Sequence, residues 1–247
     1  EPRLLKLNFG IMCLHILLMS TFVALPGQLA ASGFPAAEHW KIYLVTMLIS
    51  FVSVVPYIIY AEVKRKMKRV FVGCVALLLI AEIVLWGSGP HFWELIAGVQ
   101  LFFLAFNLME ALLPSLISKE SPAGYKGTAM GIYSTSQFLG VAIGGALGGW
   151  VDGLFDSQTV FLAGALLAMV WLLVASTMKE PRYVSSLRVE IPEDVEINDV
   201  LKARLQTTKG VSEVLIVPDE RSAYVKIDSK VTNRFEVEQA LRESPAC

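Results

Sequence analysis

LFFLAFNLMEALLPSLIS, residues Leu101–Ser118, is an apolar run that carries an amide, a carboxylate and a proline through its middle. Asn107 and Glu110 are three residues apart, so they share a face of a helix, and Gln100 lies near the same stripe. A charged carboxylate near mid-bilayer costs about 3 kcal/mol, so such a residue is rare and usually faces a bundle interior or a wet cavity. Glu110, with Asn107, is therefore a candidate functional site. The alternative is a carboxylate hydrogen-bonded to a neighbouring helix as packing.

The composition indicates a membrane protein with a small polar appendage. Of 247 residues, 55% are apolar and 17% are charged, and the mean hydropathy is +0.58. Ordinary soluble domains are about 25% charged. The charges are also uneven, because residues 1–183 hold 12 of the 21 Lys and Arg and 10 of the 22 Asp and Glu. We therefore expect a membrane part over 1–183 and a charged soluble domain over 184–247.

Six apolar stretches are long enough, at about 20 residues each, to span a bilayer as helices. They are residues 7–29, 42–60, 70–86, 92–118, 128–149 and 160–178. If the spans alternate in direction, eleven Lys and Arg residues lie on one side of the membrane and only Lys41 on the other. This asymmetry predicts that both ends, and the C-terminal domain, lie in the cytoplasm.

Other polar residues inside the apolar stretches are weaker candidates for lining a cavity. They are Gln100, His15 and Gln28, together with Tyr133 and Gln137 in the fifth stretch. Each has the alternative of a hydrogen bond that only packs helices together. Glu82 stands four residues before Trp86, and we expect it at the outer membrane surface, within reach of water.

The fifth stretch is rich in glycine. Its spacing gives overlapping GxxxG pairs, which allow close approach of a neighbouring helix in lipid. The predicted packing glycines are Gly140, Gly144, Gly145, Gly148 and Gly149.

The six spans, a basic loop between the second and third, and the segment GVAIGGALGG resemble the C-terminal half of a major facilitator superfamily transporter. The loop AEVKRKMKRV is similar to that superfamily's loop signature, an acid followed by a basic cluster, although its glycine and clear aspartate are absent. The matching cytoplasmic loop residues are Glu62, Lys64, Arg65, Lys68 and Arg69. The chain as a whole, including YVKIDSKVTNRFEVEQA, is similar to a bacterial inner-membrane branch that carries a C-terminal cytoplasmic domain.

The resemblance implies a twelve-span transporter of which this chain supplies spans seven to twelve. It implies an N-terminal six-helix half before residue 1 as partner, and a path for a small-molecule substrate between the halves. The first and fourth spans here would line that path, which places Glu110 and Asn107 on a lining helix. The resemblance identifies no substrate.

Residues after Pro181 predict a ferredoxin-like unit of β-α-β-β-α order. This order, with GVSEVLIV after the first helix, also resembles heavy-metal-associated domains, in which two cysteines bind the metal. The equivalent loop here, PEDVEIND, has no cysteine, so we expect no metal and no cofactor. Tyr224 is the only aromatic residue in the predicted strands, which argues against a nucleic acid partner.

Three functions remain open from the sequence. The first is secondary transport, with proton-coupled efflux as the expected form and Glu110 as the proton carrier. The second is a C-terminal module that senses a ligand or metal and regulates the spans. The third is a half that only packs against the rest of a transporter. An enzyme is not expected, because the sequence has no nucleophile and base pair, phosphate loop or metal-ligand spacing.

Overall fold

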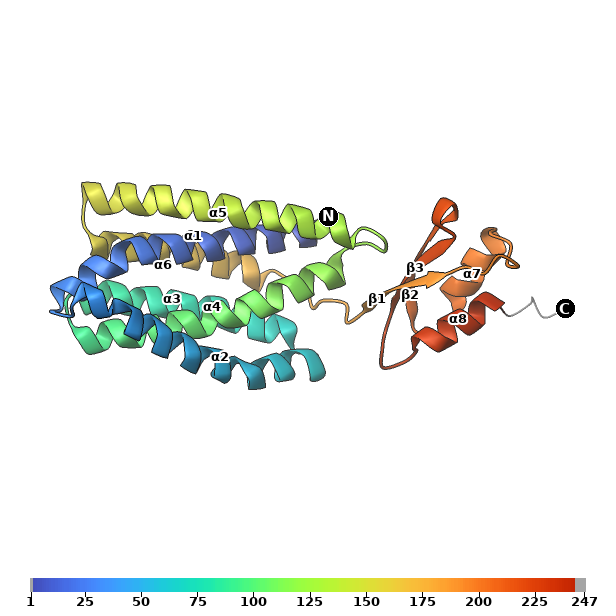
Figure 1. The fold of residues 1–247 in the computed structure, drawn as a ribbon, viewed down its shortest axis with the longest axis horizontal. Coiled ribbons are helices and arrows are strands. Elements are labelled where there is room, and N and C mark those ends of the chain that lie inside the picture. The colour runs from blue at the N-terminus through green and yellow to red at the C-terminus, as the bar shows by residue number, and fades with distance from the viewer. Residues whose placement is uncertain (1, 243–247) are drawn as a thin grey trace. The chain divides into compact units, whose positions relative to one another are not determined.

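The computed structural model describes residues 2–242. Six long helices form its first three quarters (Figure 1). They are α1 (Pro2–Ala31), α2 (His39–Val63), α3 (Met67–Ser88), α4 (Phe92–Glu120), α5 (Lys126–Leu154) and α6 (Ser157–Ser176), and the short helix η1 (Ala36–Glu38) precedes α2. The six predicted apolar helices are confirmed as helices.

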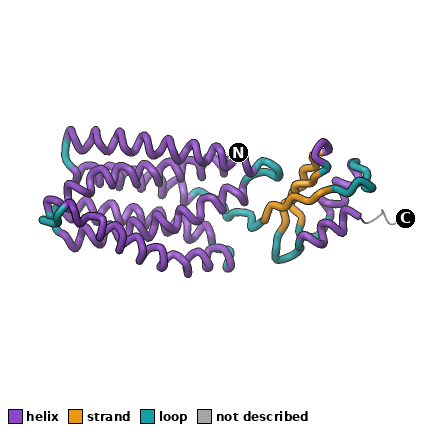
Figure 2. The backbone as a smooth tube through the Cα atoms, viewed as in Figure 1, coloured by secondary structure: helices purple, strands orange, loops and turns teal. Residues whose placement is uncertain are grey.

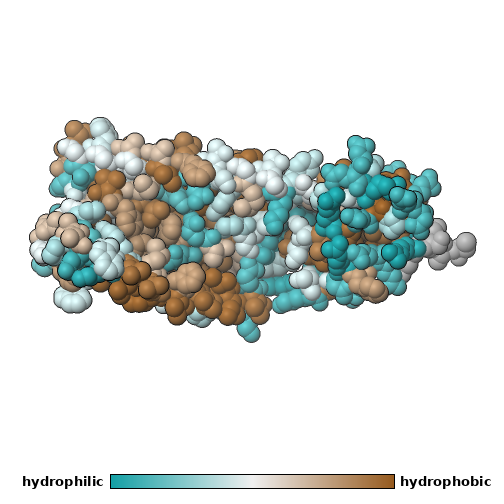
Figure 3. Space-filling model, viewed as in Figure 1, coloured by the Kyte–Doolittle hydropathy of each residue, from teal (hydrophilic) through white to brown (hydrophobic). Residues whose placement is uncertain are grey.

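Five segments are long and apolar enough to cross a membrane: α1, residues Ala36–Val63, α3, α4 and α6. Helix α5 is as long as α4 but is not among them. Glycines and polar side chains such as Gln137 lower its hydropathy. The apolar character is clearest on α2, whose large exposed side chains include Leu48, Phe51 and Val52 (Figure 3).

Helix α6 packs against both α1 and α3. Trp171 on α6 is 1% exposed, and its indole lies 3.2 Å from where a Cβ atom on Gly10 of α1 would stand. The same ring meets Phe71 of α3 edge to face. At the start of α1, Lys6 Nζ donates to Thr177 Oγ1 at 2.9 Å. The first and last of the six helices are therefore held together.

Helix α5 packs against α1 through three glycines at a spacing of four. A Cβ atom on Gly140 would lie 2.5 Å from the carbonyl oxygen of Met12, and one on Gly144 would lie 2.6 Å from that of Ile16. A Cβ atom on Gly148 would lie 2.8 Å from Ser20 Cα. The residue numbers rise together on both helices, so α1 and α5 run parallel.

The described chain forms two compact units, residues 2–115 with 132–180 and residues 116–131 with 181–242. Residues 116–131, which the sequence predicted to belong to the membrane part, thus group with the C-terminal part. The change of unit within α4 falls between Ser115 and Leu116, one residue beyond Pro114.

The C-terminal part is a small α+β fold, as predicted from its order of elements. It consists of β1 (Ser185–Glu190), α7 (Asp199–Thr207), β2 (Val211–Val217), η2 (Pro218–Glu220), β3 (Ser222–Ile227) and α8 (Arg234–Arg242). Among the described residues, strands are confined to this part (Figure 2). The sheet order is β1-β3-β2, and β3 is antiparallel to both neighbours. This is the split β-α-β arrangement of ferredoxin-like folds.

Alternation along the strands separates two faces of this sheet. One face holds Val189, Ala223 and Val225, which are at most 1% exposed and belong to a core with Leu205 of α7 and Val237 of α8. The opposite face is the outer face, where Glu213 pairs with Lys226 and Leu215 pairs with Tyr224.

Candidate functional site

The predicted carboxylate of α4 lies against a histidine of α1. His15 Nε2 is 3.3 Å from Glu110 Oε1, and the two side chains are 5% and 35% exposed. Gln137 Nε2 of α5 lies 3.0 Å from the same histidine nitrogen. Three of the residues predicted to couple protons or line a cavity, from three different helices, therefore meet at one atom.

The hydrogen bond of the other ring nitrogen, Nδ1, determines that Nε2 is the atom of His15 that can gain or lose a proton. His15 Nδ1 lies 3.1 Å from the carbonyl oxygen of Ile11, and because a carbonyl only accepts, Nδ1 carries a hydrogen. Nε2 is then an acceptor in the neutral ring and a donor in the charged ring. In the neutral ring, the Gln137 amide donates to Nε2. In the charged ring, Nε2–H faces the Glu110 carboxylate.

The surroundings of this pair are apolar on one side and polar on the other. Phe106 meets the His15 ring edge to face, with ring centroids 5.7 Å apart. Tyr133 of α5 is 4% exposed and interacts electrostatically with Glu110. Within the described residues, Glu110 Oε1 is buried and makes no hydrogen bond. His15 Nε2, at 3.3 Å, is thus the polar group that faces this carboxylate oxygen.

Asn107 and Gln100 lie on α4 but bond elsewhere. Asn107 Nδ2 donates to the sulfur of Met47 at 3.1 Å, and Gln100 Nε2 donates to the Ser50 hydroxyl at 2.7 Å and to the carbonyl of Thr46 at 3.1 Å. Their partners are all on α2. The polar stripe predicted on α4 is thus divided, with Glu110 directed at α1 and the amides at α2.

Gln28 does not join the cluster. It is half-buried near the end of α1, thirteen residues after His15, which is about 20 Å along a helix.

The predicted loop residues turn the chain between α2 and α3. Glu62 accepts a hydrogen bond from Ser115 Oγ of α4 at 2.6 Å. Arg65 has φ of 54°, the left-handed backbone that closes the turn, and Lys64 is the C-cap of α2. Lys68 and Arg69 begin α3, and Arg69 lines one end of an apolar groove between α2, α3 and α4.

The prediction for Glu82 was wrong. This carboxylate of α3 is fully buried rather than at the membrane surface, and its Oε1 accepts a hydrogen bond from Thr21 Oγ1 of α1 at 2.6 Å. Gly164 of α6 leaves room for it, because a Cβ atom there would lie 2.9 Å from Oε2. The prediction used only the short distance in sequence between Glu82 and Trp86. That distance does not show whether Glu82 is buried, because Gly164, which leaves room for its carboxylate, lies on α6, far away in sequence.

Gly145 and Gly149 were predicted to pack against a neighbour together with Gly140, Gly144 and Gly148. A Cβ atom on Gly145 or Gly149 would meet nothing within 4 Å. Only the three glycines at a strict four-residue spacing face α1, because one helix face contacts one partner.

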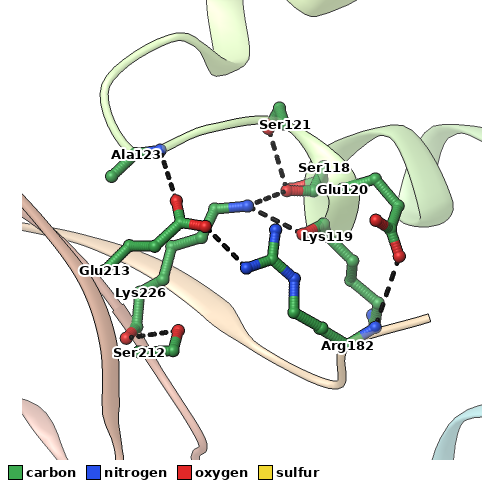
Figure 4. A network of polar contacts seen from close by, with 9 residues as sticks. All are labelled: Ser118, Lys119, Glu120, Ser121, Ala123, Arg182, Ser212, Glu213 and Lys226. Carbon is green, nitrogen blue, oxygen red and sulfur yellow. Dashed lines mark hydrogen bonds and ion pairs between the residues drawn. The ribbon is translucent and has the colours of Figure 1, made fainter. Parts of the chain in front are cut away.

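A second polar cluster, which the sequence analysis missed, lies in the second unit (Figure 4). Lys226 of β3 is fully buried, and its Nζ donates to the carbonyl oxygens of Lys119 at 2.7 Å and Ser118 at 3.3 Å. Glu213 of β2 accepts from the backbone N–H of Ala123 at 3.1 Å and pairs with Arg182 at 2.6 Å. The last turn of α4 thus ends against the outer face of the C-terminal sheet.

The electrostatics of Glu213 follow from these partners. Partial burial alone would raise the pKa of this carboxyl, but the hydrogen bonds from Arg182 and the Ala123 N–H, with the positive charge of Lys226, outweigh it and hold the pKa below its ordinary value. Glu213 is therefore ionised at neutral pH.

Comparison with known proteins gives the class of the protein first. A stretch of 107 residues is 31% identical to an uncharacterized MFS-type transporter of Pseudomonas aeruginosa strain UCBPP-PA14, covering 43% of this chain and 26% of that protein. A stretch of 139 residues is 38% identical to an uncharacterized transporter of Buchnera aphidicola subsp. Acyrthosiphon pisum, covering 56% of this chain and 36% of that protein. The chain therefore resembles transporters of the major facilitator type.

The particular resemblance is to the inner membrane transport protein YajR of Escherichia coli strain K12. The two are 78% identical over 244 residues, which is 99% of this chain and 54% of that protein. Residues 187–243 match the family model of the YajR YAM domain. The predicted resemblance to an inner-membrane branch of the superfamily with an added C-terminal domain is confirmed. The chain spans 54% of the length of the Escherichia coli protein and 36% of that of the Buchnera protein.

Proposed function

We propose that this chain is the C-terminal half of a secondary active transporter of the bacterial inner membrane. In this proposal it works with an N-terminal six-helix half to carry out proton-coupled efflux of a small molecule, and it catalyses no chemical reaction. The observation that carries the proposal is the position of His15 Nε2 between Glu110 Oε1 and Gln137 Nε2. The three relatives described above are all named as transporters, which supports the general class.

The geometry offers a way for one proton to change which helices are held together. When His15 is neutral, Nε2 accepts from Gln137, which links α1 to α5. When Nε2 gains a proton it becomes a donor, and the nearest acceptor is the Glu110 carboxylate, which links α1 to α4. A proton arriving at this pair therefore favours one arrangement of the three helices over another.

The pair can also hold a proton without a net charge. When His15 is charged and Glu110 is ionised, the two charges offset each other. A second proton, bound by Glu110, would leave the single positive charge of His15. A cationic substrate near Glu110 would then compete with the proton for the carboxylate. Such competition is the basis of exchange between a proton and a substrate.

The test measures proton flux in proteoliposomes that contain the complete two-half protein. A panel of cationic and anionic compounds is added to the wild type, Glu110→Gln and His15→Gln, with Glu94→Gln as a control in the exposed first turn of the same helix. We expect a compound-driven flux that both site variants lose and Glu94→Gln keeps. A wild-type flux that neither site variant reduces would contradict the assignment of these residues.

A second function is favoured by the contacts of Lys226 and Glu213. We propose that the C-terminal domain regulates transport, since its sheet holds the end of the helix that carries Glu110. Removing the domain after Arg182 should change the transport rate or its response to effectors. Unchanged transport in that truncated protein would exclude regulation by the domain.

A further inference from the structure

The outer face of the C-terminal sheet is covered by a segment of the same chain. Its central side chains come from β2 and β3, and Gly124, in the loop after α4, lies against two of them. A Cβ atom on Gly124 would stand 2.4 Å from Leu215 Cδ2 and 3.6 Å from Tyr224 Cγ. Gly124 also has φ of 80°, which disfavours any other residue. Glycine therefore suits this position, chiefly because of its positive φ, and a larger side chain would also displace Leu215.

Lys226 caps the helix that ends there. The final carbonyls of a helix have no partner within it, and they carry its partial negative charge. Lys226 Nζ donates to two of them, those of Ser118 and Lys119, and Ser121 Oγ donates to the Ser118 carbonyl at 3.0 Å. A fully buried ammonium is tolerated only where such partners surround it. Lys226 therefore stabilises this helix end, and the helix carbonyls in turn make the burial of its ammonium group possible.

Glu213 and Arg182 close the contact around Lys226. Glu213 binds the Ala123 N–H on one side and the Arg182 guanidinium on the other, while the Arg182 N–H donates to Glu120 Oε1 at 3.3 Å. The sheet thus supplies one acceptor, the Glu213 carboxylate, and one donor, the Lys226 ammonium, and the segment supplies the matching N–H and carbonyl groups (Figure 4). The contact is built from complementary charges as well as from apolar packing.

We propose that this sheet face is an internal docking surface for residues 118–124, through which the C-terminal domain controls the exposure of Glu110. The proposal deepens the regulation proposed above and rests on the proposed function for the role of Glu110. Docking fixes the last turn of α4, and undocking releases it.

The path from the docked turn to Glu110 runs through Pro114. Proline has no N–H, so the carbonyl of Glu110, four residues earlier, lacks the donor that an α-helix would give it. The helix is therefore weakest in the turn between Glu110 and Pro114. A displacement of the docked end is absorbed in that turn, next to the carboxylate.

The experiment compares four forms of the complete transporter in nanodiscs: wild type, Lys226→Met, Gly124→Val and Gly127→Ala. Lys226→Met removes the donors to α4, and Gly124→Val obstructs the close approach. Gly127→Ala is the matched control, because a Cβ atom there meets nothing within 4 Å. Two quantities are measured, amide hydrogen exchange over 116–131 and the rate at which dicyclohexylcarbodiimide modifies Glu110. The carbodiimide attacks protonated carboxyl groups in apolar surroundings, so it reports on Glu110 without a known substrate.

We expect both docking variants to raise exchange over 116–131 and to change the Glu110 modification rate by about threefold or more. Gly127→Ala should leave both at wild-type values. Unchanged exchange in α7 shows that the domain stays folded.

Two results would overturn the proposal. Unchanged exchange over 116–131 in both docking variants would mean that the sheet does not hold this segment. Raised exchange with an unchanged Glu110 rate would mean that docking does not reach the carboxylate. Neither result bears on proton coupling, which the flux assay with Glu110→Gln tests separately.

Discussion

Substituting alanine for single glycines of α5 should separate the face that contacts α1 from the face that does not. At Gly144 the added Cβ atom would lie 2.6 Å from the carbonyl oxygen of Ile16, whereas at Gly145 it would meet nothing within 4 Å. The two substitutions add the same methyl group to adjacent residues of one helix. Any difference between them therefore reports on contact with α1 alone.

The size of the difference follows from the geometry. An ordinary contact needs at least 3.4 Å, so Gly144→Ala forces α1 and α5 apart by about 0.8 Å, enough to lose a quarter to a half of the dispersion energy along the contact. Overpacking of this kind costs about 1–3 kcal/mol. Alanine is the better helix former by up to about 1 kcal/mol, which offsets part of that cost. We expect Gly144→Ala to destabilise by about 1–2 kcal/mol and Gly145→Ala to be neutral or slightly stabilising.

Thermal unfolding of the complete protein in detergent, followed by tryptophan fluorescence, measures the effect. For 150–250 residues each kcal/mol corresponds to about 2–4 °C in Tm, and the shift is smaller for a longer protein. In the complete protein Gly144→Ala should therefore unfold about 1–4 °C below Gly145→Ala. Equal midpoints for the two variants would refute the assignment of the contacting face.

Three further outcomes are expected. Glu82→Gln should retain stability because an amide oxygen still accepts from Thr21, whereas Glu82→Leu should cost about 1–3 kcal/mol by leaving that hydroxyl unpaired, as unfolding midpoints will show. Because the pKa of Glu213 is lowered on folding, its contribution to docking is full above about pH 5 and is lost as pH falls below about 4.3. The protection of the 116–131 amides, taken relative to their intrinsic exchange rate at each pH, should therefore fall in acid, and Glu213→Gln should remove that dependence. Asn198→Ala should destabilise α7 by about 1 kcal/mol, because the Asn198 side chain caps it, and exchange of the α7 amides will measure this.

The apolar patterning was enough to predict six helices and the order of the C-terminal elements. Each depends on local properties, such as a stretch of about 20 apolar residues or alternation along a strand. Glu110 was found for the same reason, since a carboxylate in such a stretch is conspicuous by itself. What local patterning cannot supply is the partner across the interface.

The partners explain the failures. His15 and Glu110 are 95 residues apart, and nothing in either stretch shows that they meet. Gly145 matched the same motif as Gly144, but a one-residue difference is a rotation of about 100° around the helix. Lys226 belongs to a strand in which polar and apolar residues alternate, and this pattern predicts that one face of the strand is exposed to solvent. The segment that buries this face lies about 100 residues earlier.

The packing of α1 against α6 has a consequence for biosynthesis. Gly10 leaves the ribosome 161 residues before Trp171, the side chain that it is shaped to receive. At about 5–20 residues per second, α1 waits for about 8–30 s in the bilayer before its partner exists. During that interval Gly10 lacks its neighbour Trp171 on α6, and the buried His15 lacks its neighbour Gln137 on α5. The first helix of this chain is thus among the last to reach its final surroundings, and a nascent chain stopped before α5 should be recognised by membrane quality control as unassembled.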